Sequence, residues 1–187
     1  MDNKEFIRKK YLIKRKKNFI NIENNYFNPL IKIIRKNNKY KKKYISLYYP
    51  SNFEVNILNI LDIDFFKNSI FLLPIIEENG SMNFYKWKKN DILFVNKYGV
   101  LEPKKSIIKF PDIILVPLLA FDRNKNRIGY GKGFYDRYLN NSIKNNKKIL
   151  SVGVAFSFQK YHKLPINKKD FRLDFIITEK GLVKWIY

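Results

Sequence analysis

Apolar residues in this chain gather in short runs that alternate with longer amphipathic stretches. Five runs are too short for core helices and are bounded by turn-forming residues, so each predicts a buried strand. These runs cover residues 44–49, 69–73, 113–116, 149–155 and 171–178. Four stretches predict helices, at residues 4–17, 24–36, 54–66 and 134–139, with Ser51 or Asn52 as the cap of the third.

Alternation of strands and helices predicts the fold class. We expect a single α/β domain over residues 1–187, with a mostly parallel, twisted sheet and helices on both faces in a Rossmann-like three-layer arrangement. A length of 187 residues and an apolar fraction of 45% are enough for one substantial core. Residues 75–103 are expected to form short strands and turns instead of a helix.

Composition excludes several kinds of site. The chain has no cysteine, which excludes disulfides and thiolate metal sites, and its one histidine, His162, disfavours a histidine triad or zinc site. No apolar run approaches the roughly 20 residues that span a bilayer, and the N-terminus lacks an apolar signal core. We therefore expect a cytoplasmic protein with no membrane partner.

The charge of the chain is strongly positive, with a formal net charge of +22. Residues 1–50 hold 15 Lys and Arg against 3 Asp and Glu, so a nucleic-acid-binding module is one alternative. However, Lys outnumbers Arg 31 to 7, whereas recognition of bases and phosphates favours Arg. A nucleic-acid module would also leave the glycine-rich loop described next unexplained, so no nucleic-acid partner is expected.

Residues 112–139 carry the most distinctive pattern. An apolar run is followed by a turn at residues 122–126, then by the glycine-rich string RIGYGKG at residues 127–133, and then by the predicted helix. Strand, glycine-rich loop and helix are typical of a phosphate site, because glycines let the backbone approach an anion and free amides point at it. Arg127 and Lys132 would add positive charge there. The spacing fits neither a Walker A loop nor a dinucleotide fingerprint, and the glycines alone are also compatible with a tight turn.

The whole string is more specific than its glycines. VPLLAFD at residues 116–122, followed by RIGYGKGFYDR at residues 127–137, closely resembles the signature of the 5-formyltetrahydrofolate cyclo-ligase family, also called 5,10-methenyltetrahydrofolate synthetases. The resemblance extends over nearly the whole chain. It implies ATP-dependent closure of 5-formyltetrahydrofolate, with or without a polyglutamate tail, to 5,10-methenyltetrahydrofolate, with release of ADP and phosphate. It implies ATP and Mg²⁺ as cofactors, and we expect a monomer.

The resemblance also implies the nucleotide site. Lys4 and Arg8 lie four residues apart on the first helix and so share a face; in the family such a pair helps to bind the ATP phosphates, while from spacing alone a solvated basic face is the alternative. The glycine-rich stretch supplies the other expected ATP contacts: Arg127, Gly129, Tyr130, Gly131, Lys132, Gly133, Phe134 and Tyr135. Arg127 and Lys132 are the expected catalytic residues, because they would neutralise charge on the transferred phosphoryl group.

A second set of residues is implied for folate. Tyr49 and Glu54 stand in the order Tyr-Pro-x-x-x-Glu-Val, which resembles the family segment whose Glu contacts the pterin, and a carboxylate suits two parallel hydrogen bonds from that ring. A Glu in a first helical turn is otherwise an ordinary surface residue. Trp87, Phe121 and Tyr130 are the expected aromatic contacts, with burial in the core as the alternative for aromatic residues such as Trp87.

Asp136 and Asp170 are the metal ligands that the resemblance implies for Mg²⁺. Without it, each would be an ordinary helix-start or turn residue. Retention of both argues against the further alternative of a nucleotide-binding regulator without catalysis. Lys169 stands where similar proteins often have His, which matters only if that His has a direct role.

Overall fold

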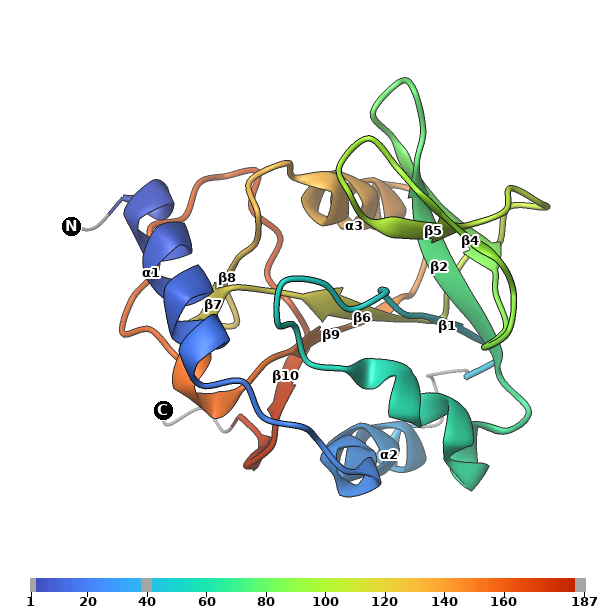
Figure 1. Ribbon diagram of the computed structural model, residues 1–187, viewed down its shortest axis with the longest axis horizontal. Helices are drawn as coiled ribbons and strands as arrows, with labels where there is room; N and C mark the ends of the chain where they lie inside the picture. Colours follow the sequence, from blue (N-terminus) through green and yellow to red (C-terminus); the bar gives the residue numbers. More distant parts are fainter. Residues whose placement is uncertain (1–2, 38–41, 184–187) are drawn as a thin grey trace.

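A computed structural model of the chain describes residues 3–37 and 42–183 (Figure 1). Within these residues, seven strands form one sheet in the order β11-β10-β9-β6-β1-β2-β3. The neighbours from β10 to β2 are parallel, and β3 and β11 pair antiparallel at the two edges. The predicted α/β fold with a mostly parallel sheet is therefore confirmed. The strands are β1 (Tyr44–Ser46), β2 (Ile70–Ile76), β3 (Met82–Lys86), β6 (Ile113–Pro117), β9 (Leu150–Val154), β10 (Phe175–Thr178) and β11 (Gly181–Leu182).

The other elements surround this sheet. Two small antiparallel ribbons pair β4 (Leu93–Val95) with β5 (Leu101–Pro103), and β7 (Ala120–Phe121) with β8 (Arg127–Ile128). The α-helices are α1 (Lys4–Lys17), α2 (Asn28–Lys36) and α3 (Phe134–Lys144). The part of the chain that the structure describes also has four 3-10 helices: η1 (Asn24–Phe27), η2 (Ile57–Asp62), η3 (Asp64–Phe66) and η4 (Ser157–Gln159). None of the helices in the described ranges is long and apolar enough to cross a membrane.

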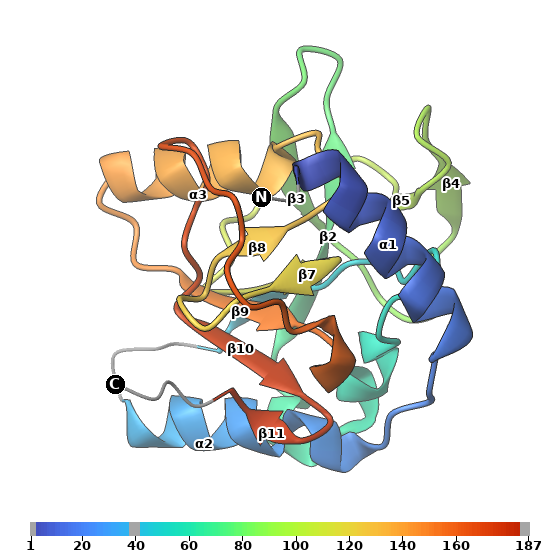
Figure 2. The same cartoon turned by 90° about the vertical axis from the view of Figure 1, so that its left-hand side faces the viewer.

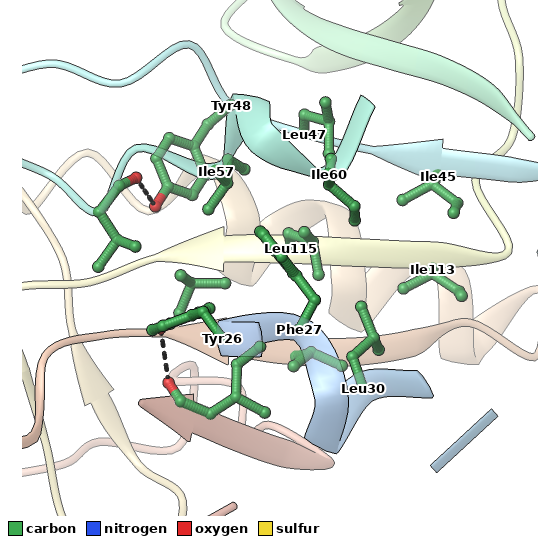
Figure 3. Packing of buried hydrophobic residues seen from close by; sticks show 14 of the residues in the cluster. Tyr26, Phe27, Leu30, Ile45, Leu47, Tyr48, Ile57, Ile60, Ile113 and Leu115 are labelled. Atoms are coloured by element: carbon green, nitrogen blue, oxygen red, sulfur yellow. Dashed lines mark hydrogen bonds between the residues drawn. The ribbon is translucent and has the colours of Figure 1, made fainter. Parts of the chain in front are cut away.

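Strand β6 shows how the sheet divides the core. Side chains alternate along a strand, so Ile113 and Leu115 pack in the cluster that includes α2 and η2, while Ile114 and Val116 pack in the cluster that includes α3. Figure 3 shows the first cluster from close by, with helical side chains such as Leu30 directed at the strands. In Figure 1, α2 and α3 cover opposite faces of the sheet.

Helix α1 lies across the end of the sheet instead of on a face (Figures 1 and 2). Its Ile7 and Tyr11 pack in a third cluster with Leu119, Ala120 and Ile128, just beyond the residue where β6 ends. α1 is therefore placed at the carboxyl end of β6, where open α/β sheets bind ligands.

The predicted helix over residues 54–66 is wrong. The chain forms two short 3-10 helices there, and Asn56 caps the first by accepting from the Leu58 amide, so the expected cap at Ser51 or Asn52 is wrong too. Asn52 and Phe53 have φ of 47° and 60°, so the backbone before Glu54 is not helical. The predicted helix over residues 24–36 begins as the separate turn η1, and α2 starts at Asn28 with Pro29 in its first turn.

Two strands of the sheet have bounds that differ from the predicted ones. β2 continues past Pro74 to Ile76, because its pairing with β1 ends at Leu72 and only β3 follows it further. The last parallel strand begins at Phe175, four residues later than expected. Asp174 therefore precedes that strand, and its carboxylate accepts hydrogen bonds from the amide and hydroxyl of Ser151 at 2.8 and 2.7 Å.

Candidate active site

The glycine loop, residues 129–133, connects β8 to α3 and has a backbone that glycine adopts most easily. Gly131 and Gly133 have φ of 95° and 67°, in the left-handed region that side chains disfavour. Gly133 is also the N-cap of α3, and no side chain caps the first turn of the helix. The first amides of α3 are therefore available to an anion, as the strand–loop–helix pattern predicts.

Helix α1 brings two positive side chains to this loop. Arg8 donates from Nε to the Gly129 carbonyl at 3.0 Å, and its guanidinium lies 3.1 Å from where a Cβ on Gly131 would stand. Lys4 forms an ion pair with Asp170. Together with Lys132, these residues line a cleft of about 740 Å³, called here the basic cleft. Both α1 residues thus border the cleft, Arg8 against the loop and Lys4 against Asp170. Five further basic residues line the cleft: Arg127, Arg137, Lys144, Lys168 and Lys169.

Arg127 and Asp136 form the pair at the base of the loop. Arg127 is 9% exposed, and its Nη2 donates to Asp136 Oδ1 at 2.8 Å while its Nη1 donates to the Phe171 carbonyl at 2.9 Å. The same Oδ1 accepts from the Phe171 amide at 2.9 Å. Arg127 therefore ties the glycine loop to α3 and to the segment before β10, in addition to bordering the basic cleft.

A second cavity of about 340 Å³ opens on the other side of the glycine loop. It is called here the aromatic pocket, because its lining includes Tyr48, Tyr49, Tyr98, Tyr130, Phe134 and Tyr135. Five residues border both cavities: Arg127, Gly129, Lys132, Gly133 and Asp136. The glycine loop is consequently a shared wall between a polar, basic cleft and a mainly apolar pocket.

Glu54 is the buried carboxylate of the aromatic pocket, with 6% of its surface exposed. Its Oε2 accepts from the amide and hydroxyl of Ser51 at 2.9 and 3.3 Å, and its Oε1 lies 4.0 Å from Nη1 of Arg15. Burial raises the pKa of Glu54, and Arg15, Ser51 and Tyr130 oppose that rise. Glu54 thus retains partners that favour its charged form inside an apolar surround.

Tyr130 connects this carboxylate to the glycine loop. Its hydroxyl accepts a hydrogen bond from Nη2 of Arg15, and the guanidinium lies 5.6 Å from the centre of its ring. Burial and the charge of Glu54 raise the pKa of Tyr130 to about 12, so the phenol is neutral near pH 7. Burial likewise raises the pKa of Tyr135, which lines the same pocket.

Two expected folate contacts lie outside the pocket. Trp87 is 3% exposed, packs in the core cluster on the α2 face and meets the ring of Tyr49 edge-on at 6.2 Å. Phe121 is 1% exposed and packs in the cluster on the α3 face. Neither lines the aromatic pocket, so packing favours a core role for both, whereas Tyr49, Glu54 and Tyr130 do line it.

The two expected metal ligands border the same basic cleft. In the described ranges no group of three or more His, Asp or Glu side chains gathers to hold a metal ion. Asp170 Oδ2 is engaged by Lys4 and by the Asn167 amide at 2.7 Å, and Asp136 Oδ1 is engaged by Arg127. Magnesium usually takes only one or two carboxylates and completes its octahedron with water and phosphate oxygens. Two carboxylates that border one basic cleft are therefore compatible in number and type with magnesium ligands.

Comparison with known proteins shows to which family the chain belongs. The model of the 5-formyltetrahydrofolate cyclo-ligase family matches residues 1–179. The chain belongs to this family. It is 35% identical over 136 residues to the 5-formyltetrahydrofolate cyclo-ligase of Mycoplasma genitalium, covering 72% of each chain. It is 30% identical over 138 residues to that of Haemophilus influenzae, covering 70% of this chain and 73% of the relative.

Solved structures agree with the family. The NMR structure of 5,10-methenyltetrahydrofolate synthetase from Aquifex aeolicus has a TM-score of 0.69 and 34% identity, with 96% of this chain and 91% of that chain covered. The structure of a 5,10-methenyltetrahydrofolate synthetase from Mycoplasma pneumoniae has a TM-score of 0.63 and 26% identity, with 96% and 99% covered. The cyclo-ligase fold thus accounts for nearly the whole chain.

Sequence reasoning missed part of this cyclo-ligase site. Arg15 was not expected in it, although Ile7, Tyr11 and Arg15 follow each other at steps of four and so form one stripe of α1. That stripe is buried, and Arg15 is 1% exposed. The turn between β4 and β5 was also missed: it contributes Asn96, Tyr98 and Val100 to the aromatic pocket. No local motif marks that contribution.

Proposed function

We propose that this protein catalyses the reaction of its family, the ATP-dependent cyclisation of 5-formyltetrahydrofolate to 5,10-methenyltetrahydrofolate, with the glycine loop between its two substrates. One observation supports this arrangement of the two substrates: the glycine loop lines both the basic cleft and the aromatic pocket. A triphosphate suits the cleft, and a flat pterin with polar edges suits the pocket. The reacting groups would then meet at the loop.

The chemistry needs such a meeting point. A formyl amide is a poor electrophile and its oxygen is a poor leaving group. Transfer of the terminal phosphoryl group of ATP to that oxygen releases ADP and removes both faults. The folate N10 then attacks the formyl carbon and loses its proton, and the C–O bond breaks so that the oxygen departs with phosphate. No protein nucleophile is required, which suits a chain without cysteine and with a single histidine.

The residues of the basic cleft would position the phosphates and neutralise their charge. Catalysis of phosphoryl transfer is mostly positioning and electrostatic stabilisation. Lys4, Arg8 and Lys132 supply positive charge, and the glycine loop and the first turn of α3 supply amides. Arg127 would act at the border of the two cavities, where it also holds Asp136 in place. Asp136 and Asp170 are the residues that would hold magnesium, which would supply positive charge to offset that of the phosphates.

The residues of the aromatic pocket would hold the pterin and exclude water. Glu54 would accept hydrogen bonds from the pterin amino group and ring N–H, because its Oε1 has looser protein contacts than Oε2. Tyr49, Tyr130 and Phe134 offer aromatic walls on three different segments. Since one chain lines both cavities, the reaction does not require a second subunit, and we propose that the enzyme acts as a monomer. The absence of cysteine suits a reducing compartment such as the cytoplasm.

The test is a direct assay of the purified protein. It is incubated with 5-formyltetrahydrofolate, ATP and magnesium, and the near-ultraviolet absorption of the methenyl product is followed. We expect product only when the nucleotide and the metal are both present, with one ADP formed for each product. Equal product without nucleotide, or no product under any of these conditions, would contradict the proposal.

A further inference from the structure

Arg15 is a buried charged residue in the candidate active site, and none of the proposed substrate contacts involves it. It lies on the last turn of α1 beside three lysines, yet only 1% of it is exposed. Burying a guanidinium costs free energy unless partners offset it. Its partners are the Leu118 carbonyl at 3.4 Å, the Tyr130 hydroxyl and the Glu54 carboxylate, while its Nε has no hydrogen-bond partner among the described residues.

Two of the partners of Arg15 border the aromatic pocket, whereas Arg15 does not. Glu54 and Tyr130 both line that pocket, from the segment after β1 and from the glycine loop. Arg15 stands behind them, and Leu118 immediately follows β6. One side chain of α1 therefore joins the sheet, the expected pterin-binding carboxylate and the loop that borders the nucleotide cleft.

The geometry is unlike that of an ion pair that serves stability alone. Close bidentate contacts are typical of strong Arg–carboxylate pairs, but here the nearest oxygen is 4.0 Å away. Tyr130 belongs to the same group of side chains, because its hydroxyl accepts from Arg15, and it also lowers the pKa of Glu54. Arg15 thus makes no close contact with Glu54 Oε1, while its positive charge stays nearby.

We propose that Arg15 is a positioning residue of the cyclo-ligase reaction. It acts through Glu54 and Tyr130 and holds the pterin-binding carboxylate in its charged form and in a fixed position relative to the glycine loop. The inference rests on the proposed function. It assigns Arg15 no contact with either substrate.

The electrostatic surroundings of Glu54 support this role. The titratable or charged groups facing it are Arg15 from α1, Tyr130 from the glycine loop, Tyr48 after β1 and Tyr135 from α3. Burial raises the pKa of all three tyrosines, so they are neutral near pH 7. Arg15 is then the one member of this set whose positive charge opposes the burial that raises the pKa of Glu54. Without it, that pKa rises further and Glu54 is protonated at a higher pH.

The first experiment compares Arg15→Gln with Arg15→Lys, which keeps the charge, and with the control Lys16→Gln on the exposed side of the same turn. We measure kcat/KM for folate against pH at saturating ATP. Loss of a hydrogen bond to a charged group predicts a fall of about 10- to 150-fold near neutral pH for Arg15→Gln. The acid limb of its profile should move to higher pH, so the loss shrinks as pH rises, with partial recovery in Arg15→Lys and no change in Lys16→Gln.

The second experiment is a double-mutant cycle. If Arg15 acts through Glu54, adding Arg15→Gln to Glu54→Gln should cost far less than it costs alone, because the carboxylate that it serves is gone. A pH-independent loss that adds fully to that of Glu54→Gln would overturn the proposal and leave Arg15 a structural ion-pair partner.

A third readout separates this inference from the proposed function. Carbon-13 NMR of labelled glutamate carboxyls follows the titration of Glu54 without any substrate, with the Glu54→Gln spectrum identifying its signal. The titration should move to higher pH in Arg15→Gln and stay in place in Lys16→Gln. An unmoved titration would refute the role of Arg15 even if the wild type is fully active, whereas a moved titration in a protein without cyclo-ligase activity would refute only the function. If Arg15→Gln does not fold, Arg15→Lys supplies the same comparison with a smaller shift.

Discussion

Gly131→Ala tests whether the contact between α1 and the glycine loop serves the nucleotide. Gly131 has φ of 95°, and an added Cβ would stand 3.1 to 3.3 Å from three atoms of the Arg8 guanidinium. The substitution therefore strains the backbone and pushes Arg8 aside. Gly181→Ala is the matched control, because Gly181 has φ of 103° and no atom of the described residues lies within 4 Å of the added Cβ.

The two effects of this substitution have different sizes. A left-handed conformation costs a non-glycine residue about 1–2 kcal/mol, and both variants should lose roughly that amount of unfolding free energy. Gly131→Ala should also move the Arg8 guanidinium from its place in the basic cleft, where a charge-assisted hydrogen bond to a phosphate would be worth about 1.5–3 kcal/mol. Since each 1.4 kcal/mol is tenfold, we expect kcat/KM for ATP to fall by about 10- to 150-fold in this variant alone.

The assay combines two measurements on each variant. Initial rates of methenyl formation are recorded at varied ATP and saturating folate, and urea unfolding gives the free energy of unfolding. If Gly131→Ala and Gly181→Ala lose similar stability and both keep wild-type kcat/KM for ATP, the reasoning is refuted, because displacement of Arg8 would then have no effect on the nucleotide.

Three further substitutions address the remaining roles. Lys132→Ala should lower kcat/KM for ATP by about 10- to 150-fold and leave the free energy of unfolding unchanged, because the residue is exposed; unchanged kinetics would make it a surface charge. Asp136→Asn should lower turnover, with partial recovery at higher magnesium, and should lower the free energy of unfolding by about 1–3 kcal/mol because buried Arg127 loses its anionic partner; normal turnover at low magnesium would rule out the metal role. Glu54→Gln should raise KM for folate far more than KM for ATP, and equal rises in both would indicate a structural role.

The pattern along the chain was sufficient to predict the fold class and the glycine loop. Runs such as residues 113–116 are buried on both faces of a parallel sheet, and such continuous apolar runs can be recognised from the sequence alone. The helix at Lys4–Lys17 was predicted with its observed bounds. The segment after Pro50 was not predictable in the same way, because the left-handed backbone at Asn52 and Phe53 opposes local preference.

The part of the site that was missed depends on tertiary contacts. Whether Arg15 is a solvated charge or a buried one depends on Leu118 and Tyr130, which lie 103 and 115 residues away in the sequence. The same holds for Tyr98, whose ring meets Phe134 at 5.6 Å across the pocket. An aromatic residue such as Trp87 looks equally suited to stacking on a ligand and to packing in a core, and only its neighbours distinguish the two.

The most direct measurement follows the formyl oxygen. 5-Formyltetrahydrofolate labelled with oxygen-18 in its formyl group is converted with unlabelled ATP and magnesium, and the released phosphate is analysed by mass spectrometry. If the phosphoryl group passes across the glycine loop to the formyl oxygen, each phosphate should carry one labelled oxygen. Unlabelled phosphate, formed together with the methenyl product, would contradict the account.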